Sequence, residues 1–396
     1  MVAALTRLFG ARHVELAEDI VADTLLKAMQ EWPFRGVPDE PAAWLHRVAR
    51  NLAIDRLRRE ARGLELLREN AALLRSEWTL SSTVNDAMSG PTIADDQLRM
   101  MFACCHPAIP REQQVALALK TLCGFSVPEI ARAFVTNEET INKRLYRARE
   151  AFRALGRIEI PSATELGQRL EHVLATIYLL FNEGYNSTSH HDLIREDLIE
   201  EALRLCDLLT RNAATDTSEV HALLALMLYH ASRSGTRIDA DGAIVLLKDQ
   251  DRSKWDAELI ALAGQHLDRA VADGAMSVYH IEAAIAGVHA HAPSFEATNW
   301  NAIVSLYDEL LRSNPSPVVQ FNRAIAVAQA EGPSVGLTAL DNVKAIDSHL
   351  YHAARGDLLR ELGRIDEARV AYALAATLTR SPAESELLRR KQDACA

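Results

Sequence analysis

Apolar residues recur along this chain at helical spacing, and almost no segment alternates apolar and polar positions as a strand would. A clear example begins at residue 166, where apolar side chains share one face of a predicted helix. Its members are Leu166, Leu170, Val173, Leu174, Ile177 and Phe181. Ala and Leu dominate the chain and clusters of β-branched residues are few, which favours helix over strand. The pattern therefore predicts an all-α fold.

Breaks in this periodicity divide the chain into successive regions. With 396 residues the chain exceeds the usual size of one hydrophobic core, so we expect two or three domains. A first helical region covers residues 1–60, and the charged and then polar stretch at 61–94 is typical of a linker. A second helical region covers residues 95–160. From Pro161 onward, helices of ordinary length follow one another through residues 161–396.

Residues 125–149, FSVPEIARAFVTNEETINKRLYRAR, have the pattern of a helix-turn-helix. A turn at residues 135–137 separates two predicted helices whose apolar positions would face each other. These positions are Ile130, Ala131, Phe134, Ile141 and Leu145. The outer side of the second helix would then carry Glu139, Asn142, Lys143, Arg144 and Arg147. Polar and basic side chains on an exposed helix of this kind predict contact with DNA.

The net charge of −11 is unevenly distributed along the chain. Residues 1–160 hold 22 of the 43 Lys and Arg and 21 of the 54 Asp and Glu, which leaves 21 and 33, a net −12, to residues 161–396. Within the first part, basic residues gather at 47–59 and 143–149. Contact with phosphates depends on such local fields rather than on the global sum, so the overall acidity does not exclude DNA binding.

Other function classes find little support in the sequence. No run of 18 apolar residues and no signal peptide is present, so we expect a cytoplasmic protein with no membrane contact. The 5 cysteines show no C-x-x-C spacing, which argues against a disulfide framework and against a metal site. No H-E-x-x-H, nucleophile elbow, Walker sequence or G-x-G-x-x-G occurs, so we expect neither an enzyme nor a bound cofactor.

Residues 41–59 predict a second nucleic-acid contact. The apolar residues Trp44, Leu45, Val48, Ala49, Leu52, Ala53 and Leu57 form one stripe of a helix, with Trp44 expected in the core. The other sides carry Arg47, Arg50, Asn51, Arg56, Arg58 and Arg59. Such a helix can hold phosphates while presenting polar groups to bases. Taken alone, it would also fit a surface helix whose arginines are only solvated.

Two segments together resemble a known family. HVELAEDIVADTLLKAMQEW, followed by PFRGVPDEPAAWLHRVARNLAIDRLRR, resembles region 2 of extracytoplasmic-function sigma factors, which are group 4 of the sigma-70 type. Residues 111–153 resemble region 4 of the same family. The resemblance implies that Glu18, Asp19 and Asp23, which we place along one face of a helix, contact the clamp of core RNA polymerase. By themselves these three carboxylates also fit a solvated acidic face.

The resemblance further implies how each region contacts promoter DNA. The arginine-rich helix and the preceding loop, residues 34–40 with Phe34 and Arg35, would capture the melted −10 strand. Part of that loop would form a pocket for an extruded base, whose unstacking costs a few kcal/mol.

Region 4 would place its second helix in the major groove of the −35 element. Asn142, Lys143 and Arg144 would lie nearest the bases, where each good contact gives about 1–3 kcal/mol of discrimination. Arg147 and Arg149 would bind phosphates, and Thr140 would start the helix or contact the DNA backbone.

The chain departs from the family pattern in two respects. It begins almost directly at the second helix expected for region 2, so we expect the preceding helix to be shortened or absent. Glu138, Glu139 and Glu150 also flank the recognition helix. The first two favour the helix N-terminus through its dipole, but they would repel a misplaced phosphate.

The C-terminal part resembles the subfamily of these sigma factors that carries a long extension similar to tetratricopeptide repeats. One repeat is visible in Gly356, Gly363, Ala368, Tyr372 and Ala375, with Pro382 near its end. A weaker copy centres on Ala324 and Gly332. Stacked helix pairs of this kind bury a continuous core and leave a concave surface.

A polar site in this extension is one further expectation. Its candidate residues are Glu183, Asp249, Asp251, Arg252 and Trp255, with His190 and His191 as further polar candidates. The extension could bind a peptide, a protein or a small ligand, or act as an acidic brake on the basic helices. Two other hypotheses remain open, namely a polymerase-independent helix-turn-helix regulator with a binding domain and a repeat-protein enzyme.

Overall fold

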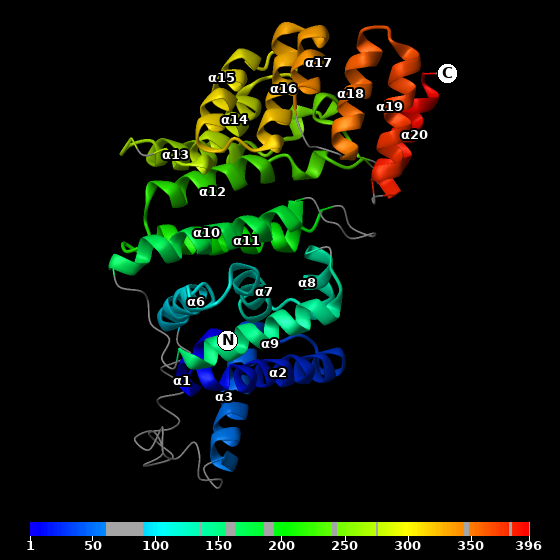
Figure 1. Ribbon diagram of the computed structural model, residues 1–396. Coiled ribbons are helices and arrows are strands. Elements are labelled where there is room, and N and C mark those ends of the chain that lie inside the picture. The colour runs from blue at the N-terminus through cyan, green and yellow to red at the C-terminus, as the bar shows by residue number, and fades with distance from the viewer. Residues whose placement is uncertain are drawn as a thin grey trace. The chain divides into compact units, whose positions relative to one another are not determined.

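A computed structural model of the protein describes most of the chain. The described residues are 1–60, 90–134, 136–155, 163–185, 194–239, 244–274, 276–343, 348–379 and 382–395. Over these ranges the regular elements are helices, and the single β-bridge joins Ile238 to Ile244 (Figure 1). The all-α prediction is therefore confirmed. No helix in the described part of the chain combines the length and the apolar character needed to span a bilayer.

The chain divides into two compact units, Met1–Thr176 and Ile177–Ala396. Over its described residues the first unit has a short helix, a 3₁₀ turn and two long helices, followed from residue 90 by four more. They are α1 (Val2–Phe9), η1 (Ala11–His13), α2 (Val14–Arg35), α3 (Pro41–Glu60), α6 (Gly90–Cys104), α7 (Arg111–Thr121), α8 (Val127–Ala133) and α9 (Glu138–Ala154). Helix α10 (Ala163–Tyr185) runs across the division.

Two hydrophobic clusters hold the first unit together. One joins α1, α2 and α3 through Ala4, Leu5, Phe9, Ala17, Ile20, Ala49 and Ala53. The other joins the start of the chain to α6, α7 and α9 through Ala3, Ala11, Val14, Met100, Ala103, Cys104, Ile109, Leu117, Ala118, Ala148 and Phe152. Residues 1–14 therefore pack into the same core as residues 100–152, although a long stretch of sequence separates them.

Three boundaries in the structure differ from those expected from the sequence. Helix α6 starts at Gly90, inside the segment expected to be a linker, and the remainder of that segment, 61–89, lies outside the described residues. Helix α2 continues through Pro33 to Arg35, so Phe34 and Arg35 belong to its last turn and not to a loop. Gly36, at φ 81°, ends the helix by donating its N–H to the Trp32 carbonyl at 2.9 Å. The compact units divide after Thr176, and not at residue 161.

The second unit is a succession of helices that pack as antiparallel neighbours (Figure 1). After the end of α10 they are α11 (Glu196–Thr210), α12 (Ser218–Ala231), η2 (Ser234–Thr236), η3 (Leu247–Asp249), η4 (Arg252–Lys254), α13 (Ala257–Ala270), α14 (Val278–His291), α15 (Trp300–Ser313), α16 (Pro317–Glu331), α17 (Pro333–Asp341), α18 (His349–Glu361), α19 (Ile365–Leu378) and α20 (Pro382–Asp393). Helix α12 is apolar and buried along almost its whole length, and it packs against α11, α13 and α14.

The predicted repeat forms a tight helix pair. Ala368, Tyr372 and Ala375 of α19 are fully buried, and Tyr372 packs against Gly356 of α18 so closely that a Cβ at Gly356 would lie 2.7 Å from the ring. Gly363, at φ 74°, makes the turn between the two helices. Ala324 is likewise buried. The residues chosen from sequence thus occupy packing positions, and the assignment to tetratricopeptide repeats stays a prediction.

Candidate nucleic-acid interface

Helices α8 and α9 form the helix-turn-helix pattern expected at residues 125–149. Ile130 of α8 and Ile141 and Leu145 of α9 are buried, as the periodicity predicts. Asn137 caps α9, and its Oδ1 accepts the Thr140 N–H at 2.8 Å. Thr140 therefore takes part in starting the helix. Val135, in the turn, lies outside the described residues.

The N-terminal half of α9 presents its polar side chains to solvent. Asn142, Lys143 and Arg147 are exposed, and Lys143 has only a surface ion pair with Glu139 at 2.7 Å, which is weak enough to be exchanged for a phosphate or a base. Tyr146 is exposed on the same helix, with 66% of its surface accessible. Sequence reasoning did not select Tyr146, although an aromatic residue between Asn142 and Arg147 is a usable signal.

Arg144 is held more firmly than the other predicted base-contacting residues. Its guanidinium lies over the Phe134 ring at 5.5 Å and pairs with Glu112 of α7 at 2.7 Å. Its side chain is only 24% exposed. Arg144 thus braces α9 against α7 and α8 in this structure, so Asn142 and Lys143 are the better candidates for reading bases.

The C-terminal half of α9 faces inward. Ala148 and Phe152 are fully buried in the cluster shared with residues 3–14. Arg149 donates to Glu18 of α2 at 2.6 Å, and its Nε lies 3.9 Å from a Glu15 carboxylate oxygen. Arg153 also pairs with Glu15. The structure therefore differs from the expectation for Arg149, which is a partner of α2 and does not face solvent as a phosphate contact.

The three acidic residues of α2 do not share one face, which corrects the sequence interpretation. Asp19 and Asp23 are exposed, whereas the Glu18 side chain is 17% exposed and faces α9. Adjacent residues on a helix point about 100° apart, and here Glu18 is turned toward α9 while Asp19 is turned toward solvent. Burial raises the pKa of Glu18 above its usual value, and this effect exceeds the opposing attraction of Arg149.

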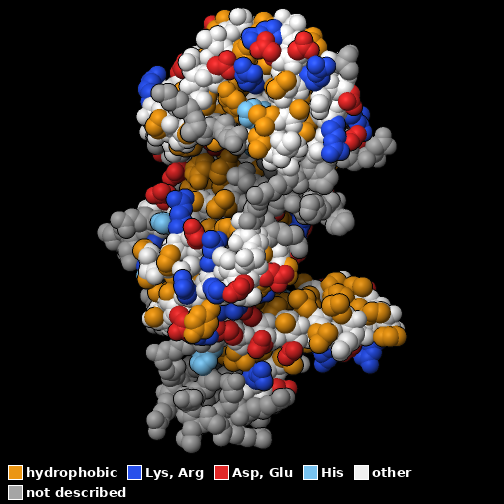
Figure 2. Space-filling model, turned by 45° about the vertical axis from the view of Figure 1, so that its right-hand side comes forward, with side chains coloured by type: hydrophobic (Ala, Val, Ile, Leu, Met, Phe, Trp, Pro, Cys, Tyr) orange, Lys and Arg blue, Asp and Glu red, His pale blue; other side chains and the backbone are white. Residues whose placement is uncertain are grey.

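An apolar surface continues from Asp19 and Asp23 along α2. Asp19, Asp23 and Leu26 follow one another at i, i+4 and i+7, so they share the exposed side of the helix. Other exposed large apolar residues on this helix and the loop after it are Leu25, Met29, Phe34 and Val37, and Phe34 is 89% exposed. The space-filling view shows hydrophobic side chains gathered on one projection of the first unit, consistent with this surface (Figure 2). The sequence pattern indicates the acidic residues but not Leu26 and Met29, because apolar residues on a helix usually indicate a buried side.

Helix α3 carries the residues expected at the −10 element. Arg47 and Asn51 are exposed, while Arg50 and Arg56 are half-buried. The side chains of Arg58 and Arg59 lie outside the described residues. Trp44 is half-buried, with its ring edge-on to Trp32 of α2 at 5.5 Å, so it packs between helices as expected. Arg35, in the last turn of α2, is exposed and lies 3.4 Å from Glu31.

The candidate residues at 249–255 of the extension have packing roles, and the Arg252 guanidinium lies over the Trp255 ring at 4.9 Å. Asp251 caps η4 by accepting the Ser253 N–H at 3.1 Å, and Asp249 is exposed in η3. Arg252 donates to the carbonyls of His289 and Ala292 at 2.6 and 2.8 Å. Trp255 is buried, and its Nε1–H donates to Thr236.

These contacts hold the 244–256 segment onto α14 and η2. One polar site formed by these residues together with Glu183 stays a prediction. His190 and His191 lie outside the described residues.

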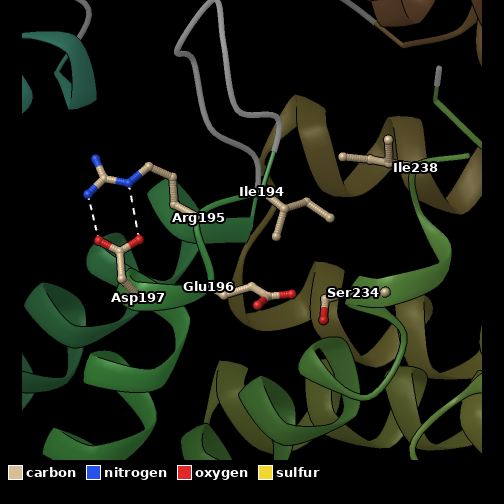
Figure 3. A pocket seen from close by; sticks show the side chains of 7 residues that line it. Ile194, Arg195, Glu196, Asp197, Ser234 and Ile238 are labelled. Carbon is tan, nitrogen blue, oxygen red and sulfur yellow. Dashed lines mark hydrogen bonds and ion pairs between the residues drawn. The ribbon is translucent and has the colours of Figure 1, made fainter. Parts of the chain in front are cut away.

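A pocket of about 480 Å³ lies elsewhere in the second unit (Figure 3). It is lined by Ile194, Arg195, Glu196, Asp197, Ser234, Gly235 and Ile238. Arg195 donates to Asp197 through two hydrogen bonds of 3.1 and 2.6 Å, so its charge is already compensated. Ile194 and Ile238 give the pocket apolar walls. None of the candidate residues from the sequence lines this pocket, and no local sequence motif predicts it.

Two half-buried histidines lie beside a smaller cavity in the same unit. The cavity measures about 30 Å³, and His230 and His289 contribute to its wall together with Arg233 and Trp255. Burial, reinforced by neighbouring arginines, lowers the pKa of His230 to about 3 and that of His289 to about 4. Both rings are therefore neutral near pH 7. Among the described residues, no group of His, Cys, Asp and Glu is arranged to hold a metal ion.

Three family models match the chain. Sigma-70 region 2 matches residues 1–63, and Sigma-70 region 4 matches residues 99–152. A family of unknown function, DUF6596, matches residues 169–271. The uncharacterized protein R00370 of Rhizobium meliloti (strain 1021) is 40% identical over 393 residues, which cover 98% of this chain and 92% of that protein. No solved structure matches the chain.

Proposed function

We propose that this chain, which belongs to the sigma-70 family and has its region 2 and region 4 domains, directs core RNA polymerase to specific promoters by two separate DNA contacts. The sigma-70 family comprises transcription initiation factors that are not enzymes. The finer assignment, with region 4 on the −35 element and region 2 on the −10 element, is our inference. The observation that carries it is the outer face of α9, where Asn142, Lys143 and Arg147 are exposed on a capped helix.

In region 4 the N-terminal half of α9 would enter the major groove. Asn142 and Lys143 would contact base edges, since amide and ammonium groups match adenine and guanine patterns. Arg147 would bind a phosphate on one side of the groove. Thr140 and the first turn of α9 would approach the DNA backbone, where exposed N–H groups favour an anion.

In region 2 the exposed side of α3 would hold the melted strand. Arg47 and Asn51 are free to meet phosphates and bases, and Phe34 offers an exposed ring at the end of α2. A ring of this kind can stack on an unpaired base, which contributes about 1–3 kcal/mol. Arg35 is exposed beside Phe34 and could bind an adjacent phosphate.

Core polymerase would bind the acidic and apolar side of α2. Asp19 and Asp23 supply charge, while Leu26 and Met29 supply apolar area that water would otherwise cover. A mixed surface of this kind suits a protein partner better than it suits DNA, whose phosphates would be repelled by the two carboxylates. The apolar residues would then supply most of the binding free energy, and Asp19 and Asp23 would supply the specificity.

The extension would regulate these contacts. Its net charge of about −12 fits a surface that competes with DNA for basic helices. The pocket at Ile194 and Ile238 would offer a place for a peptide or a small ligand. A chain ending after Leu155 tests the direction of regulation. Higher promoter-directed activity supports a brake, and lost activity means that the extension is required.

Run-off transcription with purified core polymerase tests the main proposal. Replacing Asn142 and Lys143 by Ala should reduce transcription from a −35-dependent promoter at least about 10-fold per lost base contact, and should leave binding to core polymerase unchanged. The control is Arg312→Ala, an exposed residue of α15 in the second unit. Full-affinity binding to promoter duplex without polymerase would instead favour an independent helix-turn-helix regulator.

A further inference from the structure

The 30 Å³ cavity of the second unit has in its wall a guanidinium whose hydrogen-bond donors are unused. Arg233 follows the C-terminal end of α12 and is half-buried. Its guanidinium lies over the Tyr185 ring at 5.4 Å, and it has neither an ion pair nor a hydrogen bond with any residue that the structure describes. A guanidinium presents its N–H donors in a planar fork that matches a carboxylate. These donors are therefore available to a molecule in the cavity.

The surroundings of Arg233 hold an excess of positive charge. Burial lowers the pKa of several neighbouring basic groups, and the charge of Arg233 lowers each of these pKa values further. The groups are Arg237, Arg252, His230 and His289. The carboxylate of Glu296 acts on Arg252 in the opposite direction, but it lies exposed to solvent. A half-buried region with this excess of charge attracts an anion.

Arg252 and Trp255 hold the cavity wall in place. The Arg252 guanidinium donates to the carbonyls of His289 and Ala292 and, at 3.1 Å, to Thr298 Oγ1. It also lies over the ring of Trp255, which lines the cavity. The segment that carries both residues is thus fixed to the end of α14. A site whose wall is fixed in advance loses little conformational entropy when a ligand binds.

The size of the cavity indicates which anion it can hold. A volume of about 30 Å³ has room for about two water molecules. The oxygens of one carboxylate fill a similar space, whereas a phosphate or a sulfate needs more. Leu247, Ala286 and Ala290 give the cavity apolar walls. These side chains suit a short apolar tail attached to the carboxylate.

We propose that this cavity binds a small carboxylate ligand with a short apolar tail, and that the fork of Arg233 holds the carboxylate. The nearby charges of Arg237 and Arg252 strengthen the attraction, because the site is partly shielded from water. The site lies within the second unit and does not depend on the promoter contacts of the first unit.

Sodium acetate is the probe for this site. It replaces sodium chloride at constant ionic strength, so that general screening stays the same. As acetate is added to the full-length chain, amide hydrogen exchange should slow in residues 229–234 and 286–290. The effect should saturate with a dissociation constant of about 1–10 mM, as expected for so small a ligand. Sodium phosphate at the same ionic strength should protect these residues less, because phosphate is too large for the cavity.

Variants of Arg233 test its role. Arg233→Gln should weaken acetate binding about 10-fold or more, because it removes the charge and the fork. Arg233→Lys keeps the charge without the fork and should bind acetate with intermediate affinity. Arg312→Gln, which removes an exposed positive charge from α15, is the matched control and should bind acetate like the native chain. The urea midpoint of each variant without acetate shows whether it folds.

Several results would overturn the site. They are the absence of saturable protection in the native chain, protection confined to other residues, and unchanged acetate affinity in Arg233→Gln. Stronger protection by phosphate than by acetate would overturn the choice of a carboxylate. If Arg233→Gln did not fold, Arg233→Lys and the position of the protected residues in the native chain would decide. Acetate binding as expected, together with no run-off transcript, would refute the proposed function and leave the site standing.

Discussion

The two units of this protein use charge in different ways. In the second unit many ion pairs lie within one helix, such as Arg204 with Glu201 and Arg312 with Glu309, each at i and i+3. In the first unit the ion pairs of Arg149 and Arg153 reach across to α2, more than a hundred residues earlier in the chain. Local pairs support a helix wherever it is, whereas distant pairs hold one arrangement of helices. The first unit is therefore the one in which losing a few charges can change the conformation.

The hydrophobic clusters show the same contrast. The cluster around Tyr372 joins helices that follow one another in sequence, from α16 to α20. The cluster around Phe152 joins residues 3–14 with residues 100–152. Units built from neighbouring helices fold from local contacts, and units closed by distant contacts carry a larger loop-closure cost. Each difference can be tested by damaging one unit and observing the other.

The largest expected effect comes from removing a large buried side chain from either hydrophobic core. Phe152→Ala and Tyr372→Ala each remove a fully buried ring, and we expect each to lower the free energy of unfolding of its own unit by about 3–5 kcal/mol. Hydrogen exchange read separately over residues 98–152 and 349–378 measures both effects. If Phe152→Ala destabilised both stretches equally, the division into independent units would be wrong.

A smaller effect is expected from overpacking. In Gly356→Ala the new Cβ would lie 2.7 Å from the Tyr372 ring, so we expect a loss of about 1–3 kcal/mol in the second unit. Gly167→Ala is the control, because nothing lies within 4 Å of the added Cβ. That change should be neutral or stabilise the helix by up to about 1 kcal/mol. Chemical denaturation followed by circular dichroism distinguishes the two variants.

Acid should weaken the second unit. His230 and His289 have pKa values of about 3 and 4 in the folded chain, well below the ordinary value of 6.5. Between about pH 4 and pH 6.5 the unfolded chain therefore binds more protons than the folded chain. The free energy of unfolding should fall as the pH drops from about 6.5 towards 4. The urea midpoint at pH 5 and pH 7 measures this loss. Replacing both histidines by Gln should flatten the dependence, and an unchanged slope would contradict the assignment.

The smallest expected effect has the opposite pH dependence and concerns the ion pair of Glu18 in α2 with Arg149 in α9. Burial raises the pKa of Glu18 in this contact, so the chain binds more protons when the contact is formed than when it is broken. The contact should therefore strengthen as the pH falls through the raised pKa, and weaken as the pH rises. Exchange in residues 145–153, corrected for the intrinsic effect of pH, measures it. Glu18→Gln should abolish the dependence.

Much of the architecture could be predicted from sequence because it depends on local periodicity. Ile141 and Leu145 are spaced to bury one side of α9, and the structure buries them. The same spacing leaves Asn142 and Lys143 outside. Gly356 and Tyr372 could be predicted as packing positions because the repeat pattern has small and aromatic residues at regular intervals. Short-range patterns of this kind are visible in one sequence, since helix geometry alone relates their members.

Other features depended on segments that no local pattern relates. Phe34 looked like part of a loop because Pro33 and Gly36 flank it, but α2 continues to Arg35. Arg252 and Trp255 looked like members of a site, whereas packing onto α14 and η2 gives them local roles. The pocket at Ile194 and Ile238 brings together the start of α11 and the segment after α12. None of these outcomes follows from spacing.

By itself the sequence determined that the protein is helical, that it has two nucleic-acid-binding patterns and that its acidity lies in the C-terminal part. Periodicity and composition are sufficient for these conclusions, because they concern helices one at a time. Only the tertiary structure decided that Glu18 faces Arg149 and that the N-terminal and C-terminal halves of α9 have different surroundings. Which surface a helix buries depends on the partner it meets, and that partner is set by the packing of the whole unit.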